Sequence, residues 1–318
     1  MTRTTMFAIS VFGAAGLAFA ALAPDPAQFM GQWAINGSDS AGTVNLALSR
    51  RSNHGSMSNS RDWPVDKLDG LTASQLKATA GSVVKFRIAR EPGTLECEGY
   101  VKNGNGGGTF VFAANQSFVP AMRTLGFSGL DDEKLFALAV HDVTTKWTRD
   151  LRAEGIEIRD TDQLLAMAIH GVSADFAREM KQQGFAGLSG DNLVAMRIHG
   201  ATPAYVREMK TIGLHPTVDN ILAMRIHGVT PEFARQLKDM GYATVSIDQM
   251  LAMRIHGAST DYIRALEKLG YKRPSVDQLI AMRIHGVTPE YIQKLQSRGM
   301  KNLTVDDLVR MRIHGIAD

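Results

Sequence analysis

Histidine recurs through the second part of the chain at an almost constant interval. Successive members of this histidine column are separated by 29, 29, 28, 29, 29 and 29 residues. Imidazole is a common metal ligand and general base, so a regular series could mark a metal or catalytic site. The column consists of His141, His170, His199, His227, His256, His285 and His314.

The spacing argues against that chemistry. A zinc site needs three or four ligands at about 2.0–2.1 Å from one ion, whereas equivalent residues of stacked helical repeats lie about 8–10 Å apart. Gly follows six of the histidines and Asp142 follows the other, so no His-Glu-x-x-His motif occurs. We therefore predict no metal and no cofactor. Each histidine closes a helix, where partners for terminal carbonyl groups are needed, and we expect all seven to be structural joints between repeats.

The elements around the histidines repeat with the same period. An aromatic column accompanies them, and each repeat carries the start and stop signals of two helices. The first helix opens with a capping box, as in "SVDQ" (Ser275 to Gln278), and ends at His-Gly. The second opens with "TPE" (Thr230 to Glu232), where Thr caps and Pro occupies the first turn. The aromatic column is Phe118, Trp147, Phe176, Tyr205, Phe233, Tyr262 and Tyr291.

This pattern predicts an α-solenoid of roughly 29-residue helical-hairpin repeats. The second helix has one apolar face. The first helix, "QLIAMRIHG", is apolar nearly all round, so we expect it to be buried between its neighbours.

An arginine two residues before the histidine forms a second column, which Ala139 and Ala168 replace in the first two repeats. One interpretation is a basic stripe that binds an acidic partner surface. The other, which we favour, is ion pairing between repeats, with Asp219, Asp248 and Asp277, with Asp306, or with acids of the second helices. The candidate partner-binding residues are Arg197, Arg225, Arg254, Arg283 and Arg312.

The first part of the chain alternates with a period of two residues. "TVNLALSR" and "VVKFRIAR" place apolar residues on one face, which is typical of half-buried antiparallel strands. "NGNGGG" (Asn103 to Gly108) is expected to be a hairpin loop. The single cysteine, Cys97, is expected to be a buried, inert thiol. A small-molecule pocket near Trp33 and Trp63 is the alternative functional site.

The fold class predicted is thus α+β with two domains, a small antiparallel β-sheet domain followed by the solenoid. A basic start and an apolar run indicate a signal peptide over residues 1–20, with cleavage alternatively after 23, or else a retained anchor. The β domain should span 24–116 and the repeats 117–318. We expect an exported protein, periplasmic or secreted, without a transmembrane segment once the signal is removed.

Composition and motifs point away from catalysis and nucleic acid. The net charge is +3 and is spread along the chain, unlike the concentrated basic face of a nucleic-acid binder. "SVVK" (Ser82 to Lys85) lies in a predicted strand rather than at a helix start, and no Gly-x-Ser-x-Gly motif occurs. We predict a protein that is not an enzyme.

The repeat unit "LIAMRIHGVTPEYI", with "FVPAMRTLGF" and "KLFALAVHDV" before it, resembles a bacterial extracytoplasmic repeat. Similar repeats form tails of beta-lactam-sensor-type membrane metallopeptidases and occur in stand-alone exported proteins. The resemblance covers about residues 108–318 and does not include the peptidase part. It implies an interaction role, so we expect the repeats to bind a protein or peptide partner in envelope sensing. The alternative is binding of a small molecule or envelope component by the β domain, with the repeats as a spacer.

Overall fold

The computed structural model describes residues 29–37, 42–52 and 55–316, and the chain divides into two compact units. One unit holds the β-sheet, and the other comprises residues 90–93 and 114–318. The predicted signal peptide lies outside the described residues. Within the described ranges, no helix has both the length and the apolar character that crossing a membrane requires.

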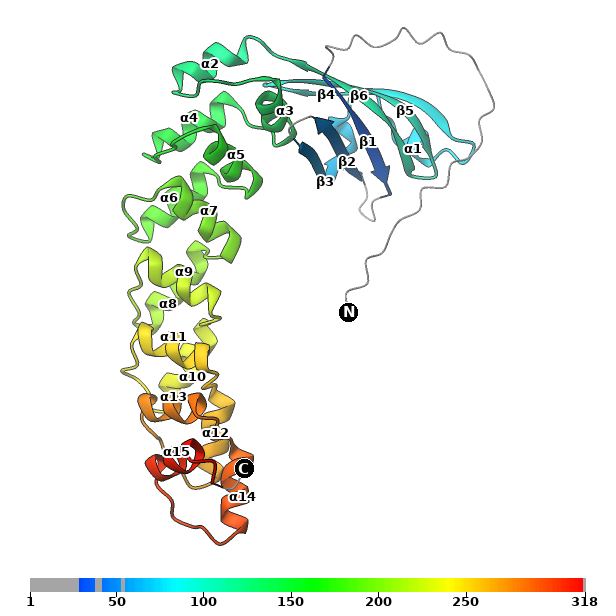
Figure 1. Ribbon diagram of the computed structural model, residues 1–318. Helices are drawn as coiled ribbons and strands as arrows, with labels where there is room; N and C mark the ends of the chain where they lie inside the picture. Colours follow the sequence, from blue (N-terminus) through cyan, green and yellow to red (C-terminus); the bar gives the residue numbers. More distant parts are fainter. Residues whose placement is uncertain (1–28, 38–41, 53–54, 317–318) are drawn as a thin grey trace. The chain divides into compact units, whose positions relative to one another are not determined.

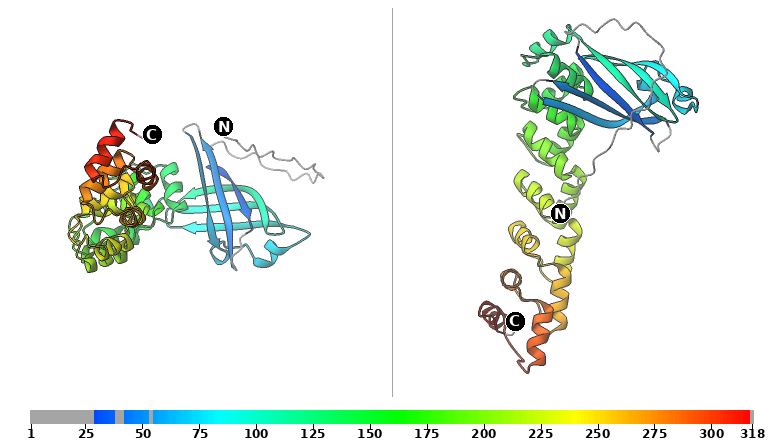
Figure 2. Two further views of the ribbon diagram at one scale, coloured as in Figure 1. Left: turned by 90° about the horizontal axis from the view of Figure 1, so that it is seen from below. Right: turned by 45° about the vertical axis from the view of Figure 1, so that its right-hand side comes forward.

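The first unit is built on one six-stranded antiparallel sheet with the strand order β3-β2-β1-β6-β5-β4 (Figures 1 and 2). Each strand pairs with its sequence neighbour except at the centre, where β1 joins β6. The strands are β1 (Met30–Asn36), β2 (Thr43–Ser52), β3 (Gly55–Pro64), β4 (Ser82–Arg90), β5 (Gly93–Lys102) and β6 (Asn105–Ala114). A 3-10 helix η1 (Val65–Lys67) and the short helix α1 (Ala73–Lys77) connect β3 to β4. The alternating pattern thus predicted the sheet correctly.

The hairpin between β5 and β6 is tighter than predicted. Only Asn103 and Gly104 form the turn, both with positive φ angles (51° and 77°), as a two-residue hairpin requires. The other glycines belong to β6. A Cβ added at Gly108 would lie 2.0 Å from the Glu98 carbonyl oxygen, so this strand needs glycine for close approach of its neighbour. The predicted loop from Asn103 to Gly108 was wrong because glycine served packing there as well as turning.

The core of the sheet contains Trp33 and Trp63, each 2% exposed. The Trp33 ring packs edge-on against Phe86 at 5.1 Å between ring centroids, and its Nε1 donates to the Glu98 carbonyl at 3.1 Å. A Cβ at Gly99 would lie 2.6 Å from the Trp33 ring. The two indole rings are therefore packed in the core of the β-sheet unit.

The second unit consists of paired helices in alternation. First helices begin with Asp, Ser or Thr side chains that accept from the backbone, and second helices begin with Thr or Ser. The first helices are α3 (Asp132–Val140), α5 (Thr161–Ile169), α7 (Gly190–His199), α9 (Val218–Ile226), α11 (Ile247–His256), α13 (Val276–Ile284) and α15 (Val305–Ile313). The second helices are α2 (Phe118–Thr124), α4 (Thr145–Ala153), α6 (Ala174–Gln182), α8 (Pro203–Ile212), α10 (Pro231–Asp239), α12 (Thr260–Lys268) and α14 (Pro289–Ser297).

Helices of one kind pack on helices of the same kind. Each first helix contacts the next first helix, from α3 and α5 through to α13 and α15, and each second helix contacts the next second helix (Figure 1). The two-domain α+β layout is confirmed. Assignment of the helical part to the α-solenoid class stays a prediction.

The β4–β5 turn belongs to the helical unit. The Glu91 carboxylate accepts from the Thr145 backbone N (2.9 Å) and Oγ1 (2.6 Å), at the positive end of the α4 dipole. The helical unit therefore includes residues 90–93, which lie between two strands of the sheet in the sequence.

Cys97 offers a direct check on the sheet. Its side chain is 3% exposed between Leu95 and Val101, as predicted, and burial raises the pKa of the thiol to about 12. We expect an aromatic disulfide reagent to leave the native protein unmodified at pH 8 and to label one thiol per chain in urea. Stoichiometric labelling of the native protein would contradict this packing.

Candidate functional site

Arginine connects each of the last five repeats to the repeat before it. In four repeats the Nε of the column arginine donates to the carbonyl oxygen of the preceding histidine, and in the last repeat to that of Gly286. The bonds are Arg197 to His170 (3.1 Å), Arg225 to His199 (3.0 Å), Arg254 to His227 (3.4 Å), Arg283 to His256 (3.3 Å) and Arg312 to Gly286 (3.1 Å). The arginine thus satisfies a carbonyl that the end of the preceding first helix leaves unpaired.

The same guanidinium groups lie over the aromatic column. The Arg225 Cζ is 4.9 Å from the centre of the Tyr205 ring, and the other four distances lie between 4.9 and 5.2 Å. This is the geometry of a cation–π contact. One side chain therefore holds both helices of the preceding repeat.

The glycine after each histidine completes this joint. Gly200 has a φ of 68°, and a Cβ there would lie 2.8 Å from the Arg225 Nη2. Glycine is needed both for the left-handed backbone and for the approach of the arginine. In the first repeat Asp142 replaces glycine, and the arginine of the following repeat is replaced by Ala168. The two residues are lost together, as the joint requires.

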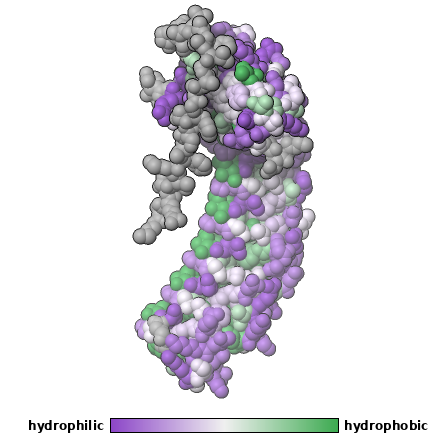
Figure 3. Space-filling view, turned by 90° about the vertical axis from the view of Figure 1, so that its right-hand side faces the viewer, coloured by the Kyte–Doolittle hydropathy of each residue, from purple (hydrophilic) through white to green (hydrophobic). Residues whose placement is uncertain are grey.

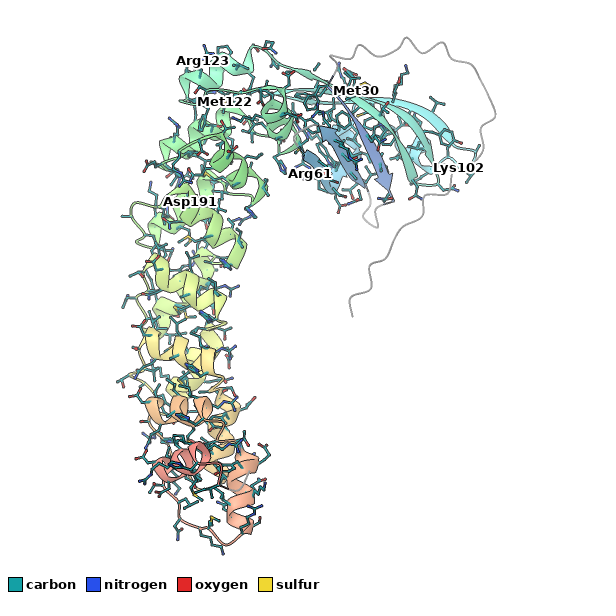
Figure 4. All side chains as sticks on the ribbon, in the orientation of Figure 1. Met30, Arg61, Lys102, Met122, Arg123 and Asp191 are labelled. Atoms are coloured by element: carbon teal, nitrogen blue, oxygen red, sulfur yellow. The ribbon has the colours of Figure 1, made fainter. Side chains whose placement is uncertain are left out.

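This geometry corrects the interpretation that we favoured from the sequence. Among the described residues, the ion pairs do not include the column arginines with Asp219, Asp248, Asp277 or Asp306. At the equivalent position of an earlier first helix lies Asp191, which is labelled in Figure 4. Asp191 pairs with Arg159, which is not a member of the arginine column. A backbone carbonyl and a ring take the place of the acids. The alternative role of the arginines in binding a partner stays a prediction.

Aromatic hydroxyl groups add a second connection between repeats, in the opposite direction along the chain. Tyr262 Oη donates to the Val287 carbonyl at 2.7 Å, and Tyr205 Oη makes the same bond to Val229 at 2.5 Å. Tyr291 Oη reaches the Ile316 carbonyl at 2.8 Å. Each of these three repeats is therefore bonded to the next through its tyrosine, whereas Phe176 and Phe233 have no hydroxyl group to donate.

The histidines are joints through their backbone only. Four of them offer the carbonyl oxygen that the next arginine binds, whereas the imidazole rings from His170 to His314 are exposed. Within the described ranges, no hydrogen bond or ion pair joins these six rings to another group. His141 is half-buried and has an interaction of its own. The prediction thus identified the right place but not the right atoms.

An exposed isoleucine precedes each of these six histidines. Their side chains are between 50% and 55% exposed, although each belongs to a helix that we expected to be buried between its neighbours. That expectation was wrong for this position. The six form what we call the isoleucine stripe: Ile169, Ile198, Ile226, Ile255, Ile284 and Ile313. Figure 3 shows hydrophobic surface recurring at intervals down one side of the helical unit.

The stripe has a defined border. Three to four residues earlier on the same helix face lies a half-buried apolar residue, as at Leu222 before Ile226, and seven residues earlier lies an exposed aspartate, as at Asp219. At the other end of the helix the exposed histidine follows. Each first helix from α5 onward therefore presents acid, apolar surface and imidazole in this order.

The sequence carried a signal for this surface. Arg-Ile-His-Gly contains four repeated residues, but a two-helix hairpin needs only some of them for caps and core. In the first pair of helices the equivalent position is Val140, which is 1% exposed. The exposed row thus begins with Ile169.

Trp33 and Trp63, near which we considered a pocket, are both packed in the core of the β-sheet unit. A surface groove of about 440 Å³ lies elsewhere, lined by residues of β1, β2 and β3 that include Arg50. The Arg50 Cζ lies 3.6 Å from the centre of the Phe29 ring. Across the described residues, no group of three or more His, Cys, Asp or Glu side chains is placed to hold a metal ion.

Comparisons with known proteins leave the function open. A scan against protein-family models gives no match, and a search of curated proteins gives none either. The resemblance of the repeat stays a prediction.

Removing one arginine should loosen one joint. We expect Arg225→Met to lower the free energy of unfolding by about 1–2 kcal/mol, because the hydrogen bond and the cation–π contact are both lost. Arg207→Met is the matched control, since Arg207 lies exposed on α8 outside any joint. Urea unfolding followed by helical circular dichroism measures both. Equal stability of the two variants would contradict the joint.

Removing one hydroxyl should have a smaller effect. Tyr262→Phe leaves the Val287 carbonyl without its donor, so we expect a loss of about 1 kcal/mol. Tyr271→Phe serves as the control, because no hydrogen bond of that hydroxyl occurs among the described residues. A Tyr262→Phe variant as stable as the parent would show that the hydroxyl does not contribute.

High pH should break the hydrogen bonds of Tyr205 and Tyr262, and that of Tyr242 Oη to the Pro274 carbonyl at 2.8 Å. Burial raises the pKa of Tyr205, Tyr242 and Tyr262 to about 12 from an ordinary value of 10.0. The unfolded chain loses these protons at a lower pH than the folded chain. The contribution of these tyrosines to the free energy of unfolding should therefore be fully present below pH 10 and should fall as the pH rises towards 12. Absorbance at an alkaline tyrosinate band, read together with circular dichroism, should show a late-titrating group of tyrosines. Full ionisation of all tyrosines near pH 10 with retained helix would contradict it.

Proposed function

We propose that this chain is an exported interaction protein, not an enzyme, whose helical repeats bind a protein or peptide partner through the isoleucine stripe. The observation that carries the proposal is the periodic exposure of the six isoleucines. Single exposed apolar residues are ordinary, but a row of equivalent ones along a repeat array is typical of an interaction surface.

The division of labour within the repeat supports this proposal. Arginine, glycine and the aromatic residue are engaged in joints, and the methionine before the arginine is buried, as at Met224 and Met253. The isoleucine takes part in none of these joints and is about half exposed. A half-exposed apolar side chain that recurs six times needs another explanation, and burial by a partner provides one. Envelope sensing remains the process that we propose for this binding.

The test compares surface variants of equal charge. The stripe variant carries Ile226→Lys, Ile255→Lys and Ile284→Lys, and lysine near a helix C-terminus is compatible with the helix dipole. The control variant carries Gln182→Lys, Ala204→Lys and Gln293→Lys, three exposed positions on second helices. Both should retain the helical circular dichroism of the parent.

Crosslinked capture from the producing cell's envelope fraction is the readout. We expect the parent and the control variant to capture the same specific protein, and the stripe variant to lose at least about nine-tenths of it, since hot-spot contacts dominate such interfaces. Equal capture by all three chains would contradict a role for the stripe.

A further inference from the structure

We infer that the partner is an extended polypeptide segment of the polyproline II type, with an apolar residue at every third position and basic residues between. This inference rests on the proposed function and specifies its ligand. Three features of the stripe lead to it: its period, its winding and its charge.

The period favours a three-residue repeat. Neighbouring first helices pack directly, so their axes are separated by about 8–10 Å. A polyproline II chain presents equivalent side chains about every 9.3 Å. One face of a β-strand presents them about every 6.6–6.8 Å. An α-helix with a heptad repeat presents them about every 10.5 Å, so the mismatch grows along the stripe.

The winding disfavours a rigid rod. Figure 1 shows α5 on one side of the second helices next to it and α15 on the other side of α14, so the first helices rotate around the stack. The isoleucine stripe rotates with them. A straight helix can contact only a few rungs of such a stripe. An extended segment without internal hydrogen bonds can follow it from rung to rung.

The charge specifies the residues between the apolar ones. Asp219, Asp248, Asp277 and Asp306 are exposed in a row about 10 Å along each helix from the isoleucine, at seven residues' distance. Among the described residues no ion pair neutralises these four. A row of acids about 10 Å from an apolar stripe is complementary to a segment whose Lys or Arg side chains extend away from its apolar residues towards that row.

The probes are synthetic peptides labelled with a fluorophore and titrated with the full chain, by anisotropy. The first contains six Leu-Lys-Pro units. The second has the same composition with leucine at alternate positions. The third replaces lysine by glutamate, and the fourth is a helix-forming peptide with leucine at heptad spacing.

We expect the first peptide to bind at least about tenfold more tightly than each of the others, a difference of one decade in Kd. The stripe variant should weaken this binding by a similar factor, and the control variant should not. Asp248→Asn with Asp277→Asn should weaken it too, and should leave a Leu-Gln-Pro peptide unaffected.

The outcomes separate the ligand from the function. The inference is overturned, and the proposed function stands, if the heptad or alternate-position peptide binds as tightly as the first. The same conclusion follows if no peptide binds while capture from the envelope still depends on the stripe. If no peptide binds and capture is also independent of the stripe, both are overturned.

Discussion

The helical unit depends on one contact that recurs between repeats: an arginine that binds a helix-terminal carbonyl and covers an aromatic ring of the preceding repeat. The contact satisfies an acceptor that the helix end leaves open and ties down two helices with one side chain. It also explains the glycine, which must both turn the chain and admit the guanidinium. Where the arginine is replaced by Ala168, the glycine is replaced by Asp142 as well, and Asp142 pairs with Arg90 instead.

The joint divides the Arg-Ile-His-Gly motif into two kinds of residue. Arginine and glycine maintain the stack, whereas isoleucine and the imidazole ring face solvent in every repeat from His170 onward. Stability in such arrays comes mainly from contacts between neighbouring repeats, which leaves the outer face available for binding. A repeated residue is therefore no measure of structural importance by itself. Its contacts decide whether it supports the stack or the surface.

Local signals predicted most of the architecture. Caps such as Ser275 with Gln278, and prolines such as Pro231, fix helix starts through backbone chemistry that sequence displays directly. The alternation in β4 likewise predicted its buried face. The exposure of Ile226 and the target of Arg225 depend on which side of a helix meets its neighbour, and hydrophobicity alone does not reveal that. Nor did glycine content separate the turn at Gly104 from the close strand approach at Gly108. The paired replacements at Asp142 and Ala168 were the one visible trace of the joint.

The central claim is that two adjacent residues, Arg225 and Ile226, have opposite roles. The most direct test is the urea unfolding midpoint of Ile226→Lys beside that of Arg225→Met, each followed by helical circular dichroism. Ile226 is 54% exposed, so the account predicts a change within about 0.5 kcal/mol for Ile226→Lys and a clear loss for Arg225→Met. A loss for Ile226→Lys as large as that for Arg225→Met would contradict the account, because the isoleucine would then belong to the stack rather than to its surface.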